Sequence, residues 1–165
     1  MTQDAGRFTR FPPHPRFIQL ETTLACNAAC GFCRQKDLER EPARMEERLW
    51  RKIISETRGL AITYRPFLQN EPLCDGRLEE VVACIKEDPT ARAELNTNGA
   101  LLGERRARAL LELGLDEVRF SIDAFSSAVY EKTRPGIDRD TVYRRVTRFC
   151  ELAQDHRCLT NVRMI

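Results

Sequence analysis

The stretch "LACNAACGFC", residues 24–33, places Cys26, Cys30 and Cys33 in one short loop of a chain that has seven cysteines in all. The residues between them include two alanines and a glycine, so the loop can curl tightly around a compact group. Three thiols this close suit a disulfide framework, most of a zinc site, or a cradle for a group that takes three thiolates and no fourth. The rest of the sequence has to decide between these interpretations.

The composition indicates one ordinary globular domain. The chain has 165 residues, 42% of them hydrophobic and 32% charged, and it contains no apolar run long enough to span a membrane. Its first residues lack the continuous apolar segment of a signal peptide, so we expect a cytoplasmic protein without a membrane partner. In a reducing compartment, clustered cysteines indicate metal binding or catalysis, and the odd number argues against a closed set of disulfides.

The charges are balanced and mixed along the chain. There are 27 basic and 25 acidic side chains, for a net charge of +2. The densest basic run, "GERRARAL" at residues 103–110, is typical of the solvated face of a helix. A protein that binds nucleic acid through phosphate contacts would show a larger or more clustered excess, so we do not expect a nucleic-acid partner.

A structural zinc site needs a fourth ligand, and such ligands commonly come in pairs. No remaining cysteine or histidine is paired in this way; they are Cys74, Cys84, Cys150, Cys158, His14 and His156. Cys84 and Cys150 lie on apolar helical faces, where we expect core residues. Three cysteines on one loop would leave one iron of a four-iron cluster without a protein ligand, and an open position on a metal centre is a place for chemistry.

Strand and helix patterns alternate along the chain. We expect strands at 17–22, 60–68, 93–97, 116–123 and 159–165, and helices at 45–60, from Leu78 to a stop at Pro89, at 103–114, at 127–134 and at 140–153. This alternation predicts an α/β fold with a parallel sheet and right-handed crossovers. Pro66 is an objection to the second strand, because proline removes a donor from the sheet. Residues 1–15 are expected to form an extended lead-in before a domain at 16–165.

Unusual polar or sulfur-bearing residues follow each of the first four expected strands. The cysteine loop follows the first strand, and Gln69, Asn70 and Glu71 follow the second. The third strand ends in "NTNG" at 96–99, and Ser121 and Asp123 end the fourth. Because the carboxyl ends of parallel strands meet at one edge of the sheet, the sequence predicts a single site there.

The motif Cys-x-x-x-Cys-x-x-Cys after a first strand, with the aromatic Phe32 before the last cysteine, resembles the signature of radical S-adenosylmethionine enzymes. The stretch "QNEP" at 69–72 stands where that family carries a Gly-Gly-Glu-Pro-like segment, with Gln69 and Asn70 in place of the glycines. "NTNG" is similar to its third-strand Thr-Asn-Gly, and "SIDAFSSAVYEKTRPG" at 121–136 to its fourth-strand segment. The resemblance runs from about residue 17 to the end.

The resemblance implies a partial (β/α)6, TIM-like barrel that holds a [4Fe-4S] cluster on Cys26, Cys30 and Cys33. The amine and carboxylate of S-adenosylmethionine would bind the fourth iron, and one electron would cleave it to a 5'-deoxyadenosyl radical that abstracts a substrate hydrogen. A reductant such as flavodoxin or ferredoxin would supply the electron.

The resemblance also implies roles for individual residues, although none for a catalytic side chain. Glu71 and Asn70 would meet the methionyl amine, and Arg134 would pair with the carboxylate. Ser121 and Asp123 would face the ribose or the carboxylate, and Phe32 would lie beside the adenine. The expected cofactor-binding residues are Phe32, Asn70, Glu71, Asn98, Ser121, Asp123 and Arg134.

The family core has a sixth strand, and this sequence ends in its fifth, so we expect the N-terminal catalytic portion of a longer enzyme. The substrate expected from the resemblance is a small molecule or a peptide, in peptide modification or cofactor biosynthesis. One alternative is a sugar- or nucleoside-modifying enzyme of the same class. The other is a non-catalytic module in which an iron–sulfur cluster or zinc only stabilises the fold.

Overall fold

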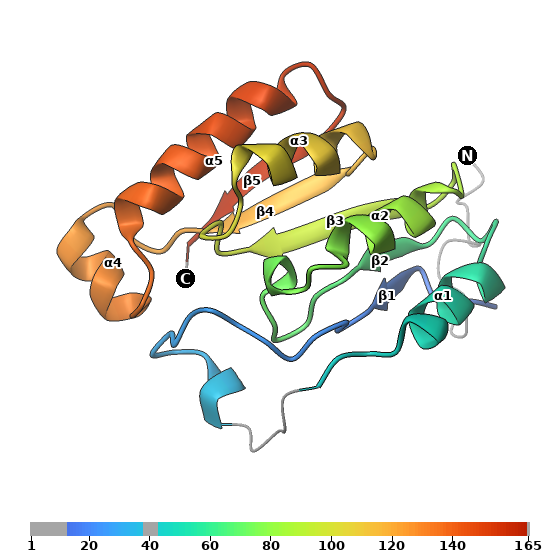
Figure 1. Cartoon of the computed structure of the whole chain (residues 1–165), viewed down its shortest axis with the longest axis horizontal. Helices are drawn as coiled ribbons and strands as arrows, with labels where there is room; N and C mark the ends of the chain where they lie inside the picture. The colour runs from blue at the N-terminus through green and yellow to red at the C-terminus, as the bar shows by residue number, and fades with distance from the viewer. Residues whose placement is uncertain (1–12, 38–42, 165) are drawn as a thin grey trace, which may run out of the picture.

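The structure is a computed structural model that describes residues 13–37 and 43–164. The expected lead-in therefore lies outside the described residues, apart from its last three positions. Five strands form one sheet in the order β1-β2-β3-β4-β5, and every neighbouring pair is parallel. The strands are β1 Phe17–Gln19, β2 Thr63–Arg65, β3 Arg92–Thr97, β4 Glu117–Ser121 and β5 Leu159–Arg163 (Figure 1). The predicted α/β fold with parallel strands is confirmed.

The connections between the strands are helical. The helices are α1 Glu47–Glu56, α2 Leu78–Lys86, α3 Glu104–Glu112, α4 Ser127–Thr133 and α5 Arg139–Ala153, with short 3-10 turns η1 Arg34–Asp37 and η2 Pro72–Cys74. Four of them, α1, α2, α3 and α5, lie along the same face of the sheet (Figure 1). Among the described residues, no helix is both long and apolar enough to cross a membrane.

Most expected elements are shorter in the structure than the sequence predicts, and for two of them the backbone gives the reason. The helix expected at 45–60 ends at Glu56, and the chain then takes positive φ values at Gly59 and Ala61, which no right-handed helix accommodates. The strand expected at 60–68 ends at Arg65, directly before Pro66, whose ring nitrogen has no proton to donate. Both differences come from local backbone chemistry and leave the strand order unchanged.

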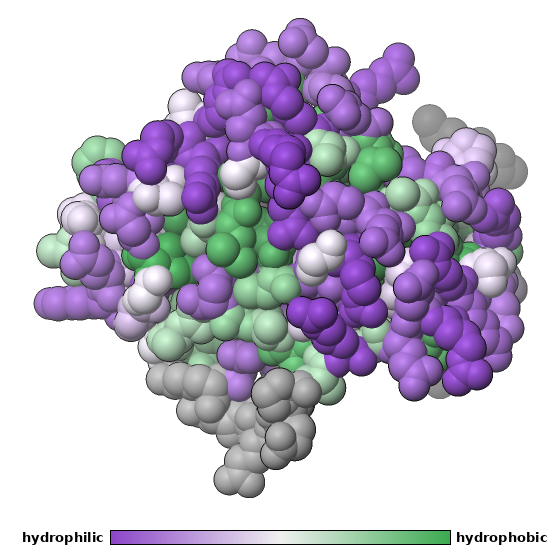
Figure 2. All heavy atoms as spheres, in the orientation of Figure 1, coloured by the Kyte–Doolittle hydropathy of each residue, from purple (hydrophilic) through white to green (hydrophobic). Residues whose placement is uncertain are grey.

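The core lies between the sheet and the helices. Side chains alternate along each strand, and one set points into this layer: Tyr64, Leu95 and Phe120 are at most 1% exposed. Phe120 meets Phe149 of α5 edge to face, with ring centroids 5.4 Å apart. Cys84 is buried in this core and Cys150 packs against it, as the sequence predicted. The outer face of the helices is mostly hydrophilic (Figure 2).

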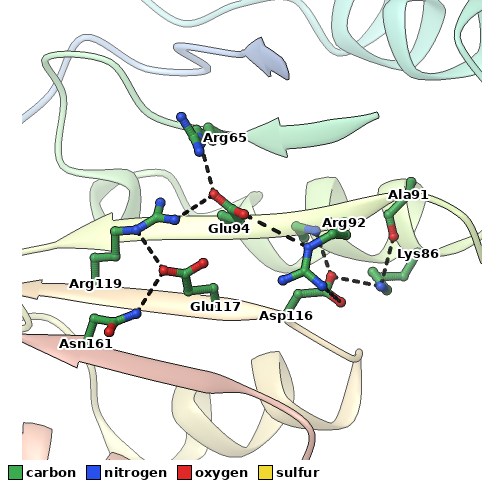
Figure 3. Close-up of polar contacts among 10 residues, drawn as sticks. Arg65, Lys86, Ala91, Arg92, Glu94, Asp116, Glu117, Arg119 and Asn161 are labelled. Atoms are coloured by element: carbon green, nitrogen blue, oxygen red, sulfur yellow. Dashed lines mark hydrogen bonds and ion pairs between the residues drawn. The ribbon is translucent and has the colours of Figure 1, made fainter. Parts of the chain in front are cut away.

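The opposite face of the sheet is polar and charged (Figure 3). Glu94 of β3 binds Arg65 of β2 and Arg119 of β4, each at 2.9 Å. Arg119 also binds Glu117 at 2.8 Å, and Asn161 of β5 donates to the same carboxylate at 2.9 Å. Polar contacts therefore connect β2 to β5 across this face. Two residues farther along the strands, the same face presents Asn96 and Ser121 at the carboxyl edge.

Candidate functional site

A pocket of about 210 Å³ lies at the carboxyl ends of the strands. It brings together the three cysteines of the loop and six of the seven expected cofactor-binding residues, namely Phe32, Asn70, Glu71, Asn98, Ser121 and Arg134. Its remaining walls are Ala28, Leu68, Gln69, Asn96 and Thr97. The seventh expected residue, Asp123, does not line the pocket and instead binds Arg134, at 2.6 Å. The convergence expected from the strand ends is thus present in the structure.

The cysteine loop is fastened to the end of α4, about a hundred residues away along the chain. The backbone N–H of Ala29 donates to Pro135 O, and that of Gly31 donates to Thr133 O, both at 3.4 Å. Within the loop, Cys33 N donates to Cys30 O at 3.1 Å and closes a turn. These contacts bury Cys30, which is 7% exposed, and leave Cys26 and Cys33 half-buried.

All seven cysteines are free thiols. Burial raises the pKa of Cys26 to about 11 and raises the pKa of Cys30, which the charge of Arg134 partly counteracts. Such thiols bind a metal as thiolates, and their protons leave to solvent when the metal binds. Among the described residues, no three Cys, His, Asp or Glu side chains are grouped as they would be around one metal ion. A four-iron cluster is a different case, because each thiolate binds a separate iron.

Glu71 organises the wall between β2 and β3. Its side chain is buried and accepts hydrogen bonds from Leu73 N at 3.1 Å, Thr97 Oγ1 at 2.6 Å and Asn98 N at 2.8 Å. Burial raises the pKa of Glu71 even though these three donors stabilise its charge. A carboxylate has about four acceptor positions, so Glu71 retains room for one more donor.

Two asparagines of the pocket carry buried polar atoms without a hydrogen-bond partner among the described residues. They are Nδ2 of Asn70, a donor, and Oδ1 of Asn96, an acceptor. The other polar atom of Asn70, Oδ1, already accepts from Leu68 N at 2.9 Å. Buried polar groups are nearly always satisfied in a complete site, so this pair indicates a ligand with both acceptors and donors. From the sequence, Asn96 lies on this rim but has no assigned role, because nothing in the motif shows that its Oδ1 lacks a partner.

Arg134 directly follows α4 and lines the pocket next to Cys30. Its Nη2 binds Asp123, its Nη1 donates to Cys30 Sγ at 3.5 Å, and its guanidinium lies 5.5 Å from the Phe32 ring centroid. Its Nε is buried without a partner among the residues described. The sequence assigned Asp123 and Arg134 separately to the ligand; the structure pairs them, since two opposite charges buried side by side stabilise each other.

The thiols and the unpartnered polar atoms of the pocket fit an iron–sulfur cluster with the amino and carboxylate groups of a ligand beside it. Three thiols of one loop line the pocket and supply soft ligands for iron. Unpartnered donors, Asn70 Nδ2 and Arg134 Nε, suit a carboxylate, and the unpartnered acceptor Asn96 Oδ1 suits an amine.

Comparison with known proteins gives a family and a fold. The family model described as the Radical SAM superfamily matches residues 20–164. A curated relative named "Probable GTP 3',8-cyclase" from Methanococcus maripaludis is 27% identical, over 87% of this chain and 48% of the relative. The GTP 3',8-cyclase of Mycobacterium marinum is 34% identical, over 76% of this chain and 36% of the relative. The chain thus spans half or less of the length of these relatives.

Solved structures share the fold at low sequence identity. BtrN in complex with AdoMet and 2-DOIA matches with a TM-score of 0.69 at 21% identity, covering 89% of this chain and 56% of that one. SuiB from Streptococcus suis, bound to S-adenosylmethionine, matches with a TM-score of 0.71 at 17% identity, covering 90% and 34%. These matches confirm the partial TIM-like barrel architecture.

Proposed function

The chain belongs to the radical SAM superfamily, and on that premise we propose that it is the cluster- and cofactor-binding portion of an enzyme that cleaves S-adenosylmethionine reductively. The cofactors of this family are a [4Fe-4S] cluster and S-adenosylmethionine, and solved neighbours hold AdoMet. The observation that carries the proposal is the pocket in which three thiols of one loop face buried, unpartnered donor and acceptor atoms.

Cys26, Cys30 and Cys33 are proposed to hold the cluster and to leave one iron without a protein ligand. When reduced, the cluster supplies the electron that splits S-adenosylmethionine into methionine and a 5'-deoxyadenosyl radical, which takes a hydrogen atom from the substrate. The task of this chain is to bind the cofactors and to orient the sulfonium and the substrate toward each other.

The methionyl end of S-adenosylmethionine needs acceptors for its amine and donors for its carboxylate. The remaining acceptor position of Glu71 and Oδ1 of Asn96 suit the amine. Nδ2 of Asn70 and Nε of Arg134 suit the carboxylate. The role of Asn70 in this proposal differs from the sequence expectation, because its buried atom without a partner is the donor Nδ2, whereas Oδ1 already accepts from Leu68 N.

The adenosine end is proposed to lie against Phe32 and the ends of β3 and β4. Phe32 is 44% exposed, so its ring offers a face on which the adenine can stack. Ser121 presents a hydroxyl to the pocket and suits the ribose. Asn98 contributes mainly by shaping the wall, since its amide already donates to Asn27 and accepts from Ala100 N. Asp123 acts through Arg134.

The substrate class, the reductant and the surroundings belong to the proposal as well. We propose a small-molecule or peptide substrate, in peptide modification or cofactor biosynthesis, with electrons from a flavodoxin- or ferredoxin-like protein in the cytoplasm. A nucleotide substrate is the second candidate, and it is supported by the curated relatives, which are named GTP 3',8-cyclases. Residues 16–165 would form the incomplete core domain of the whole protein.

The proposal is tested by loading the whole protein anaerobically with iron and sulfide, reducing it with dithionite and measuring 5'-deoxyadenosine after S-adenosylmethionine is added. We expect about four irons per chain and formation of 5'-deoxyadenosine. Alanine at Cys26, Cys30 or Cys33 should abolish the product. Cys150→Ala, which removes a half-buried thiol of α5 that does not line the pocket, should retain it. A loaded wild-type protein that forms no 5'-deoxyadenosine, or that holds one zinc per chain, would contradict the proposal.

A further inference from the structure

A buried contact joins the middle cysteine of the loop to the end of α4. Arg134 donates from Nη1 to Cys30 Sγ across 3.5 Å, and the two residues are 5% and 7% exposed. The backbone bonds from Ala29 and Gly31 to Pro135 and Thr133 lie on either side of this contact in the sequence. The loop and the end of α4 are therefore fastened together where the arginine meets the thiol.

The guanidinium is fixed by other groups as well. Nη2 of Arg134 binds Asp123 Oδ2 at 2.6 Å, and the side chain of Asp123 is 2% exposed. The ring of Phe32 lies 5.5 Å from the guanidinium carbon. Because Asp123 and Phe32 come from different segments, the position of Arg134 does not depend on the thiol alone. A buried arginine held in this way presents a preorganised donor to the sulfur.

We propose that Arg134 is a positioning residue for the cluster, which holds the Cys30 thiolate by an N–H···S hydrogen bond and makes the bound cluster easier to reduce. This inference rests on the proposed function, because it requires a cluster on Cys30. Reduction adds one negative charge to the cluster. The N–H···S hydrogen bond stabilises the reduced form by directing the positive end of the buried Arg134–Asp123 pair at the ligand sulfur, and burial limits the solvent screening of that effect.

The same arginine can serve the cluster and the cofactor together. A guanidinium carries five N–H donors, and the described contacts of Arg134 use Nη1 and Nη2 but not Nε. Nε can therefore donate to a carboxylate in the pocket while Nη1 stays on Cys30. The contact of Nη1 with Cys30 does not need S-adenosylmethionine. Its effect on the reduction potential is therefore expected before S-adenosylmethionine binds.

The test is the reduction potential of the cluster without S-adenosylmethionine, measured by electron paramagnetic resonance of the reconstituted whole protein at a series of fixed potentials. In Arg134→Gln, at the potential that half-reduces the wild type, we expect a reduced-to-oxidised ratio about tenfold lower, a shift of about 59 mV to more negative values for one electron. Arg134→Lys keeps the charge but loses the planar guanidinium that is held on both Cys30 and Asp123, so its potential should also fall, by less. The matched control is Arg106→Gln, since Arg106 is also largely buried and binds Glu79 but no residue of the pocket. Its potential should equal that of the wild type.

An Arg134→Gln protein with a full iron content and the wild-type potential would overturn the inference. If the glutamine variant does not take up four irons, the lysine variant decides: a lower potential than the wild type supports the inference, and an equal potential overturns it. A wild-type protein without a four-iron cluster contradicts the proposed function itself. A wild-type cluster that does not cleave S-adenosylmethionine contradicts the proposed function but leaves this measurement intact.

Discussion

Glu71 has a structural role in this pocket in addition to the cofactor-binding role proposed for it. Its buried carboxylate holds the loop after β2 against the end of β3 through Leu73, Thr97 and Asn98. The "QNEP" motif predicts that Glu71 binds the cofactor, but the motif cannot show that most of the acceptor positions of Glu71 are used inside the protein. In the proposed site, Glu71 holds the wall together and keeps one acceptor position for the methionyl amine.

Gly99, which ends the "NTNG" stretch, is required by the backbone and by its neighbours. Its φ is +75°, and a Cβ there would lie 3.1 Å from Val146 Cγ2. We expect Gly99→Ala to lower the free energy of unfolding by about 2 kcal/mol, from backbone strain and crowding against α5. Urea unfolding of the same protein measures the change.

The control for Gly99 is Gly76→Ala, because a Cβ at Gly76 meets nothing within 4 Å and its φ is not in the left-handed region. Its free energy of unfolding should stay within about 0.5 kcal/mol of the wild type. Equal effects of the two alanines would show that position 99 tolerates a side chain, against the geometry described.

At the scale of elements, the strands are held together on their polar face by charge pairs. The side chain of Glu94 in β3 is 7% exposed and binds Arg65 and Arg119. Glu94→Ala removes the carboxylate that Arg65 binds and leaves Arg119 with only Glu117. We expect the free energy of unfolding to fall by about 2 kcal/mol, because the largely buried Arg119 loses one of its two carboxylates and the partly exposed Arg65 loses its own.

Glu47→Ala in α1 is the matched control for Glu94. Glu47 pairs with Arg51 at 2.6 Å, but both side chains are nearly half exposed. An exposed pair contributes at most about 1 kcal/mol, so the control should unfold close to the wild type in urea. A loss for Glu94→Ala no larger than that of the control would mean that the polar face does not stabilise the sheet.

The helices and strands also show which features the sequence predicts. Alternating periodicity is repeated along the whole chain, so the element order and the parallel sheet follow from it. Element ends depend on single residues: Pro66 ends β2, and the positive φ values at Gly59 and Ala61 follow the end of α1. Pro66 therefore shortens β2, as its missing N–H donor suggested, but β2 still forms.

In the molecule as a whole, the sequence predicts which segments meet but not how their atoms pair. The three cysteines are neighbours in the chain, and the rule that parallel strands end at one edge gathers the other segments around them. The contact of Arg134 with Cys30 joins residues 104 positions apart. Side-chain geometry, which no motif encodes, decides that contact, the Asp123–Arg134 pair and the unpartnered Oδ1 of Asn96.

The whole molecule is proposed to hold four irons on three thiols and to leave one iron for S-adenosylmethionine. The Mössbauer spectrum of the whole protein loaded with ⁵⁷Fe, recorded before and after S-adenosylmethionine is added, tests this most directly. We predict a [4Fe-4S] spectrum in which about a quarter of the iron absorption shifts when the cofactor binds, because only one iron changes its ligands. A four-iron spectrum that S-adenosylmethionine leaves unchanged, or a protein that retains no cluster on Cys26, Cys30 and Cys33, would contradict it.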